Sequence, residues 1–179
     1  MTRRTEGDPG SLPAIPVDHS IIDVAHHPDG RPSGATAALR IEHPPARVWA
    51  IIVDVERYPG RIPMIHRVRR HGDQVTVDLK FRVAILSVGF QFVVEVKQEP
   101  ERWLELRWIA GEPRGLYLRI EVEPLDQGRA CLVRGQGSFD PQSLGFLAKY
   151  FLKHHPEIEY GIMPGVALAL VDSMRRAAG

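Results

Sequence analysis

The sequence predicts an α+β fold in which a curved antiparallel sheet of six or seven strands wraps around a long C-terminal helix, with two short helices after the first strand. Apolar residues repeat with a helical period near residue 45, with a period of two between about residues 75 and 139, and with a helical period again at the C-terminus. Short turns separate the alternating runs, which is typical of neighbouring antiparallel strands. Each run has one polar face, so the other face needs a cover, and the C-terminal helix is the predicted element long enough to provide it.

Residues 1–33 and 34–179 differ in composition. The first segment is rich in proline and glycine and has only brief apolar pieces, so we expect a flexible N-terminal tail that docks at most one short segment. The second segment is long enough to bury a core and is expected to form one domain.

The charges and the single cysteine bear on the class of protein. The chain contains 23 Lys and Arg and 22 Asp and Glu, and these are scattered, so a nucleic-acid-binding surface is not expected. Cys131 stands alone, so no intramolecular disulfide can form. No apolar run approaches the ~18 residues of a membrane span, and the N-terminus lacks the apolar stretch of a signal peptide. We therefore expect a cytoplasmic protein.

The segment 35–41 is the first predicted strand, and a short helix follows near residues 45–54. Pro45 suits the first turn of a helix, where its missing N–H is not needed. One apolar face follows from the helical spacing of Val48, Ile51, Ile52 and Val55. Asp54 is expected to cap a second short turn, which a Pro-Gly pair ends. We interpret the two short helices as a plug for one end of the sheet.

Alternation of apolar and polar residues predicts the remaining strands. The clearest runs are 75–83, 90–97, 103–108, 116–123 and 130–139. In the last run, Gly135 and Gly137 occupy positions that face inward. Glycine weakens a strand and leaves space where a side chain would pack, so these two residues indicate unfilled space between the sheet and its cover.

Two helical segments, 141–155 and 163–178, follow the strands, and Pro156 and Pro164 predict a break between them. Lysine and histidine side chains lie opposite the apolar face of 144–155, so this segment is a candidate for transient contact with an anionic membrane surface. Packing of the helix on its own domain is the simpler interpretation.

The stretch "PPARVWAIIVDVERYPGRIPMIHRV" resembles the start of the START-like (SRPBCC) helix-grip superfamily, in its polyketide cyclase / coenzyme Q-binding branch. The matching positions are Pro45, Val48, Trp49, Ile51, Ile52, Asp54, Tyr58, Pro59 and Pro63. The resemblance extends over residues 35–178, although the segment 143–161 looks longer than is usual in the family. It implies a helix-grip fold with a deep apolar cavity that binds lipids, quinones, sterols or polyketides. Some relatives are cyclases or dehydratases, and many only bind and carry a ligand.

The inward positions of the strands supply the candidate ligand-binding residues, which are almost all apolar, as a hydrophobic ligand requires. They are Phe81, Phe90, Phe92, Leu106, Trp108, Leu118, Gly135 and Gly137. For any single side chain, core packing is the alternative. His66 is the candidate catalytic acid or base, because alternation with Met64 and Val68 directs it inward at the mouth of the cavity. The alternative is a histidine at the rim that bonds a backbone carbonyl.

We expect no metal ion and no cofactor, because neighbouring histidines point apart and no cysteine or acidic residue stands at ligand spacing. No carboxylate lies on the predicted inward faces, so a nucleophilic triad is not supported. The sequence favours a carrier that binds a lipid, quinone or polyketide-like molecule. A polyketide cyclase or dehydratase is the alternative, and a third hypothesis is an interaction module that uses the outward side chains of Val93, Trp103, Ile109 and Tyr117. The oligomeric state is not predicted.

Overall fold

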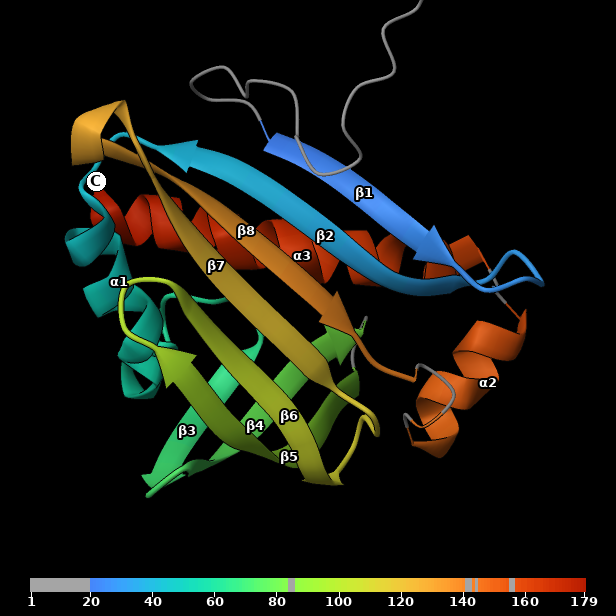
Figure 1. Ribbon diagram of the computed structural model, residues 1–179. Helices are drawn as coiled ribbons and strands as arrows, with labels where there is room; N and C mark the ends of the chain where they lie inside the picture. The colour runs from blue at the N-terminus through green and yellow to red at the C-terminus, as the bar shows by residue number, and fades with distance from the viewer. Residues whose placement is uncertain (1–19, 84–85, 141–142, 144, 155–156) are drawn as a thin grey trace, which may run out of the picture.

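The computed structural model describes residues 20–83, 86–140, 143, 145–154 and 157–179, without the side chains of 81–83, 86–88, 147–148, 151 and 157–159. The strands of this part form one antiparallel sheet in the order β1-β2-β8-β7-β6-β5-β4-β3 (Figure 1). They are β1 (Ser20–His26), β2 (Pro32–Ile41), β3 (Ile65–His71), β4 (Gln74–Val83), β5 (Leu86–Glu99), β6 (Trp103–Gly111), β7 (Tyr117–Leu125) and β8 (Ala130–Ser138). The helices and turns are α1 (Pro45–Val53), η1 (Val55–Arg57), η2 (Asp126–Gly128), α2 (Phe146–His154) and α3 (Glu157–Ala178). The sheet curves around α3, which lies behind it in Figure 1, and this arrangement confirms the predicted fold class with one strand more than expected.

The additional strand, β1, lies in the segment that the sequence assigned to a tail. It pairs with β2 from Ser20↔Leu39 to Ala25↔Gly34. Its side chains are exposed or half-buried, so backbone hydrogen bonds to β2, rather than burial, hold it in place. A strand that buries so little needs no alternating apolar pattern, which explains why the sequence did not reveal it. Residues 1–19 of the predicted tail lie outside the described part of the chain.

The two short helices, α1 and η1, occur where the sequence predicts them. α1 buries Val48, Trp49 and Ile52 and contacts both α3 and β7. Tyr58 is buried beneath it, and the Tyr58 hydroxyl donates a 2.6 Å hydrogen bond to the carbonyl of Ile52. This bond ties the end of α1 to the loop that follows η1, and the pair closes one end of the sheet as expected.

Asp54 differs from its predicted role as a cap. Its side chain makes no capping hydrogen bond to the backbone of η1. The carboxylate instead forms ion pairs with Arg57 at 3.3 Å and with Arg61 at 3.7 Å. Two guanidinium groups compete with neutral backbone N–H groups for the same oxygens, and a charged donor binds a carboxylate more strongly.

The core lies between the concave face of the sheet and α3. The side chains predicted to face inward are buried along β4 to β8, among them Val75, Val94, Leu104, Ile120 and Val133. The buried stripe of α3 includes Met163, Ala167, Leu170, Val171 and Met174. The period of two therefore assigned these strand faces correctly. Such a pattern is a reliable guide, because a shift of one residue would turn every apolar side chain of a strand to the solvent.

α3 is longer than predicted because it continues through Pro164. A proline inside a helix removes one backbone hydrogen bond and crowds the preceding turn. The flanking residues Met163 and Ala167 are both buried, and their packing on the sheet outweighs this local cost. The helix has no break within residues 157–178, so the predicted break is wrong there. α2 is a separate helix that precedes α3.

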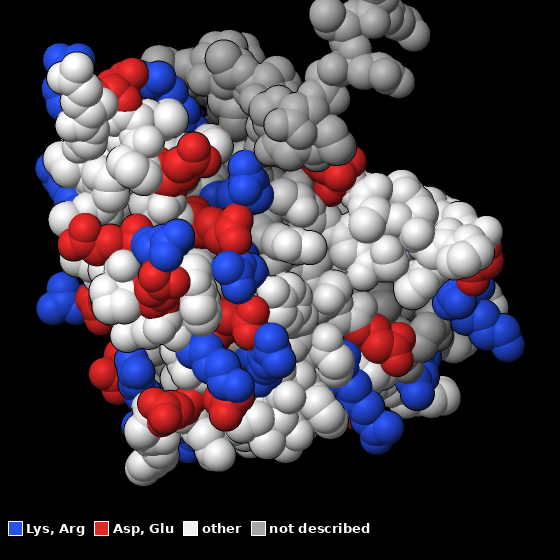
Figure 2. Space-filling view, viewed as in Figure 1, with Lys and Arg blue, Asp and Glu red and all other residues white. Residues whose placement is uncertain are grey.

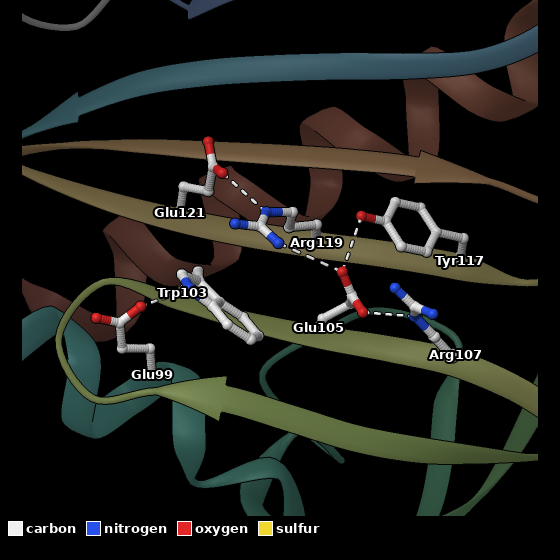
Figure 3. Close-up of polar contacts among 7 residues, drawn as sticks. All are labelled: Glu99, Trp103, Glu105, Arg107, Tyr117, Arg119 and Glu121. Atoms are coloured by element: carbon white, nitrogen blue, oxygen red, sulfur yellow. Dashed lines mark hydrogen bonds and ion pairs between the residues drawn. The ribbon is translucent and has the colours of Figure 1, made fainter.

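The convex face of the sheet carries a network of polar side chains on β6 and β7 (Figure 3). Glu105 lies at its centre with 6% of its side chain exposed. The carboxylate accepts hydrogen bonds from Arg107 (2.5 Å), Tyr117 (3.1 Å) and Arg119 (3.3 Å). The guanidinium of Arg119 also lies 4.6 Å from the ring centroid of Trp103. Burial works to raise the pKa of Glu105, but the three donors together hold it below its ordinary value of 4.5.

Glu105→Gln should lower the free energy of unfolding by about 1 kcal/mol at neutral pH, because a neutral amide accepts weaker hydrogen bonds from arginine. The folded-state pKa of Glu105 lies below the unfolded-state value. Its stabilising contribution is therefore complete above the unfolded-state pKa and is lost as the pH falls through the folded-state pKa. Urea denaturation of both proteins should show a difference that is constant near neutral pH and shrinks below about pH 4.

Glu95→Gln is the matched control for this measurement. Glu95 lies on the neighbouring strand, is half-buried, and pairs at 3.1 Å with Lys97, which is exposed. A surface pair of this kind contributes about 0–1 kcal/mol, so this variant should unfold almost as the parent does. A Glu105→Gln effect that is independent of pH would show that the carboxylate charge does not stabilise the sheet.

Candidate functional site

An apolar cavity of about 150 Å³ lies between the concave face of the sheet and the first half of α3. Strands β4 to β8 form one wall, the loop residues 58–65 form a second, and α3 residues 163–170 form a third. Pro63 and Val166 line the cavity and are also exposed, Val166 by 42%. Val166 therefore marks the mouth of the cavity on α3, whereas Pro63 also lines a separate depression beside Ser173 and Arg176.

Four of the predicted ligand-binding residues line this cavity: Phe92, Leu106, Leu118 and Gly137. Three others, Phe90, Trp108 and Gly135, do not. The side chain of Phe81 lies outside the described residues. The cavity occupies the part of the concave face that the first half of α3 leaves unfilled, so facing inward is necessary for lining it but not sufficient.

Trp108 and Phe90 illustrate this distinction. Trp108 is half-buried against the edge of the core, and its indole N–H donates a 3.1 Å hydrogen bond to the carbonyl of Gly111. Phe90 is also half-buried, at a position that pairs with Leu79. Both side chains have the predicted direction, but they lie beyond the wall of the cavity.

The two inward glycines of β8 have different surroundings. A Cβ atom at Gly135 would lie 3.1 Å from Val171 Cγ1 and 3.3 Å from Leu170 Cδ2, so glycine there lets α3 approach the sheet closely. A Cβ atom at Gly137 would meet Leu118 Cδ1 at 3.5 Å, an ordinary contact. Of the two, Gly137 leaves its space to the cavity. The prediction that both glycines do so is wrong for Gly135, because this residue lies directly under the helix.

Tyr58, Tyr117 and Ser138 supply the polar side chains among the described residues of the cavity wall. Burial raises the pKa of Tyr58, and its hydroxyl already donates to the carbonyl of Ile52. Burial and the hydrogen bond to Glu105 raise the pKa of Tyr117, whose hydroxyl turns to the convex face (Figure 3). Both phenols therefore stay neutral near neutral pH, and neither offers a base to a bound molecule.

His66, the predicted acid or base, is exposed and does not line the cavity. The pairing of β3 with β4 is irregular between Ile65 and Arg67, so His66 is the extra residue of a β-bulge. The bulge interrupts the alternation that predicted its direction, and Met64 and Ile65 line the cavity in its place. The predicted inward position of His66 is therefore wrong.

The sequence pattern does not reveal the cavity residues that come from the loop and from α3. They are Tyr58, Ile62, Pro63, Met64, Ile65, Met163, Val166, Ala167, Ala169 and Leu170. A loop has no periodic pattern that shows which side chains face inward, whereas Pro59 and Pro63 do show where the loop lies. The apolar stripe of α3 was visible, but its position over the sheet was not.

The outward aromatic residues do not favour the interaction-module hypothesis. The Trp103 indole N–H donates to Glu99 at 2.9 Å, and the guanidinium of Arg119 covers its ring. In Figure 2, acidic and basic side chains lie densely mixed over this face of the sheet. Trp103 and Tyr117 therefore belong to the polar network rather than to a free apolar surface.

Within the ranges of the chain that the structure describes, no three His, Cys, Asp or Glu side chains are grouped so that they could hold a metal ion. Among the helices described, none has the length and apolar character to cross a membrane.

Comparison with known proteins identifies the family. The family described as polyketide cyclase / dehydrase and lipid transport matches residues 41–167, more than half of the chain. No curated protein matches the sequence significantly.

The fold is similar to several solved structures. A protein of Thermus thermophilus has 13% identity and a TM-score of 0.63 over 80% of this chain and 94% of its own. A START superfamily protein of Mycobacterium smegmatis has 15% identity and a TM-score of 0.57, over 82% and 97%. The Zhui aromatase/cyclase of a Streptomyces species has 15% identity and a TM-score of 0.52, over 89% and 96%. At these identities the likeness concerns the fold, and together with the family match it shows that the chain belongs to the polyketide cyclase / dehydrase and lipid transport family, with a START-like helix-grip fold.

Proposed function

We propose that this protein binds a small hydrophobic molecule in the cavity beneath α3 and carries it without chemical change. The observation that supports this most strongly is the chemistry of the described cavity wall, which is apolar apart from three hydroxyl-bearing residues. An apolar molecule gains free energy when it leaves water for such a wall. The cytoplasmic location expected from the sequence is part of the same proposal.

The size of the cavity limits which part of a ligand it holds. A dry apolar cavity of about 150 Å³ accommodates roughly one benzene-sized ring. A quinone ring, one ring of a polyketide or the end of an acyl chain therefore fits without rearrangement. A longer ligand has to extend out of the cavity past Val166, the exposed α3 residue of its wall. Such a ligand must come from an apolar phase, and the segment 144–155 is the candidate for contact with a membrane surface.

A polyketide cyclase or dehydratase acting in the same cavity is the alternative, and the name of the family keeps it open. Ring closure or loss of water needs a group that moves a proton at the substrate. The described residues of the wall include no carboxylate, histidine or lysine, and the Ser138 hydroxyl has no such group beside it among them. This composition supports a carrier. Turnover of a linear polyketide that persists in His66→Ala, with loss in Ser138→Ala, would instead support the enzyme.

Gly137→Leu should weaken ligand binding while the fold stays intact. The Cβ atom at this position makes ordinary contacts, so the rest of the side chain would extend into the cavity. Calorimetric titration with 1,4-naphthoquinone, one ring of which would occupy the cavity and the other its mouth, should show at least about tenfold weaker binding than the parent, or about 1.4 kcal/mol. The Tm should be unchanged or higher, because leucine suits a strand better than glycine. Equal affinity in the two proteins would rule out this cavity as the site.

Gly135→Ala is the matched control on the same strand face. Its methyl group would press against Val171 and Leu170, so the free energy of unfolding should fall by about 1–3 kcal/mol. The affinity for naphthoquinone should fall much less than in Gly137→Leu, because the added methyl group lies outside the cavity and reaches its wall only through Leu170. Chemical denaturation beside the same titration separates the two effects. Loss of binding with unchanged stability would reverse the roles given to the two glycines.

A further inference from the structure

Helix α2 presents aromatic and basic side chains to solvent. Phe146 is 85% exposed, and Tyr150, one turn later, is 53% exposed. Lys149 and Lys153 are also exposed, and their spacing places them on the same face of the helix as the two aromatic residues. Leu152 is buried and holds the helix against the domain. α2 thus packs through one face and leaves an aromatic and basic face uncovered.

This exposure forms part of a larger concentration of apolar side chains. Six large hydrophobic side chains are exposed among the described residues, and four of them lie on α2 and α3: Phe146, Tyr150, Tyr160 (50%) and Val166 (42%). Both helices meet at the same end of the molecule (Figure 1), and in Figure 2 uncharged side chains at this end are interspersed with basic and acidic ones. Single exposed apolar residues are ordinary, but such a concentration marks an interaction site.

We propose that this face of α2, defined by Phe146, Lys149, Tyr150 and Lys153, docks on an anionic membrane surface. Aromatic rings are favoured at the boundary between lipid headgroups and acyl chains, and lysines bind headgroup phosphates. α2 contains two lysines and no acidic residue, so its charge complements an anionic bilayer. A helix of nine residues is too short to cross a bilayer and lies on such a surface instead.

The position of α2 in the chain connects this surface to the cavity. Ser138 and Phe139 line the cavity just before α2, and Met163 and Val166 line it just after. A bilayer against α2 would therefore lie close to the mouth of the cavity, and an apolar ligand would cross little water on its way in. This step rests on the proposed ligand-binding function, whereas the docking itself does not.

A second copy of this chain is the competing occupant. A symmetric contact through the same face would bring Lys149 and Lys153 close to the same two lysines of the other copy. Repulsion between these like charges opposes that arrangement, and anionic headgroups attract the same charges. The charge pattern therefore favours the membrane surface.

Cosedimentation of the full chain with vesicles, without added ligand, tests the docking. Binding should be stronger to vesicles of phosphatidylcholine with phosphatidylglycerol than to phosphatidylcholine alone. The double variant Phe146→Ala/Tyr150→Ala should bind anionic vesicles about tenfold more weakly, because little apolar surface remains to be buried. Lys149→Glu/Lys153→Glu should bind them at least about tenfold more weakly and lose the preference for phosphatidylglycerol. Each variant should keep the parental Tm, since the changed residues are exposed.

Ile109→Ala and Lys80→Glu are the controls, because both residues are exposed on the sheet. They should leave vesicle binding unchanged. No binding to either vesicle, equal binding to both, or equal weakening by the controls would overturn the proposal. So would α2 variants that shift a dimer to a monomer in gel filtration while vesicle binding stays the same. Naphthoquinone titration uses no vesicles, so failure of docking and failure of ligand binding remain distinguishable.

Discussion

The close contact between the sheet and α3 determines most of this structure. Gly135 has no side chain, so the second half of α3 comes close enough for Val171 and Leu170 to pack on β8. Around Val171 the core is filled. N-terminal to it, residues 163–170 leave space above β4 to β8, with Leu170 at the boundary, and this space is the cavity. One contact therefore produces both the stable core and the binding volume beside it.

The two faces of the sheet have opposite chemistry. The concave face is apolar, and the convex face holds Glu105 with its three donors. Tyr117 contributes to both faces: it lines the cavity on the concave face, and its hydroxyl donates a hydrogen bond to Glu105 on the convex face. The fold thus places its ionised groups away from the volume that takes a ligand. Such a separation favours retention of an apolar molecule. Among the described residues, it leaves no ionised side chain near the ligand that could transfer a proton in a reaction.

The sequence predicted the parts of the fold that depend on regular burial, and it missed those that do not. The faces of β4 to β8 followed from a period of two, since each inward side chain contributes to the core. β1 escaped notice because backbone hydrogen bonds hold it. The bulge at His66 reversed one predicted direction, and no local pattern announces a bulge. Gly135 and Gly137 were correctly placed facing inward, but their different roles depend on where α3 crosses the sheet.

The sheet is open, and β3 is the last strand in its order. Its sequence, IHRVRRH, contains three arginines and two histidines, and the side chains of all five are exposed. A free strand edge is a template on which another molecule can add a strand. Two copies that met along β3 would bring rows of guanidinium groups together, and their repulsion would prevent the backbones from pairing. The arginines of β3 thus oppose pairing of two copies along this edge of the sheet.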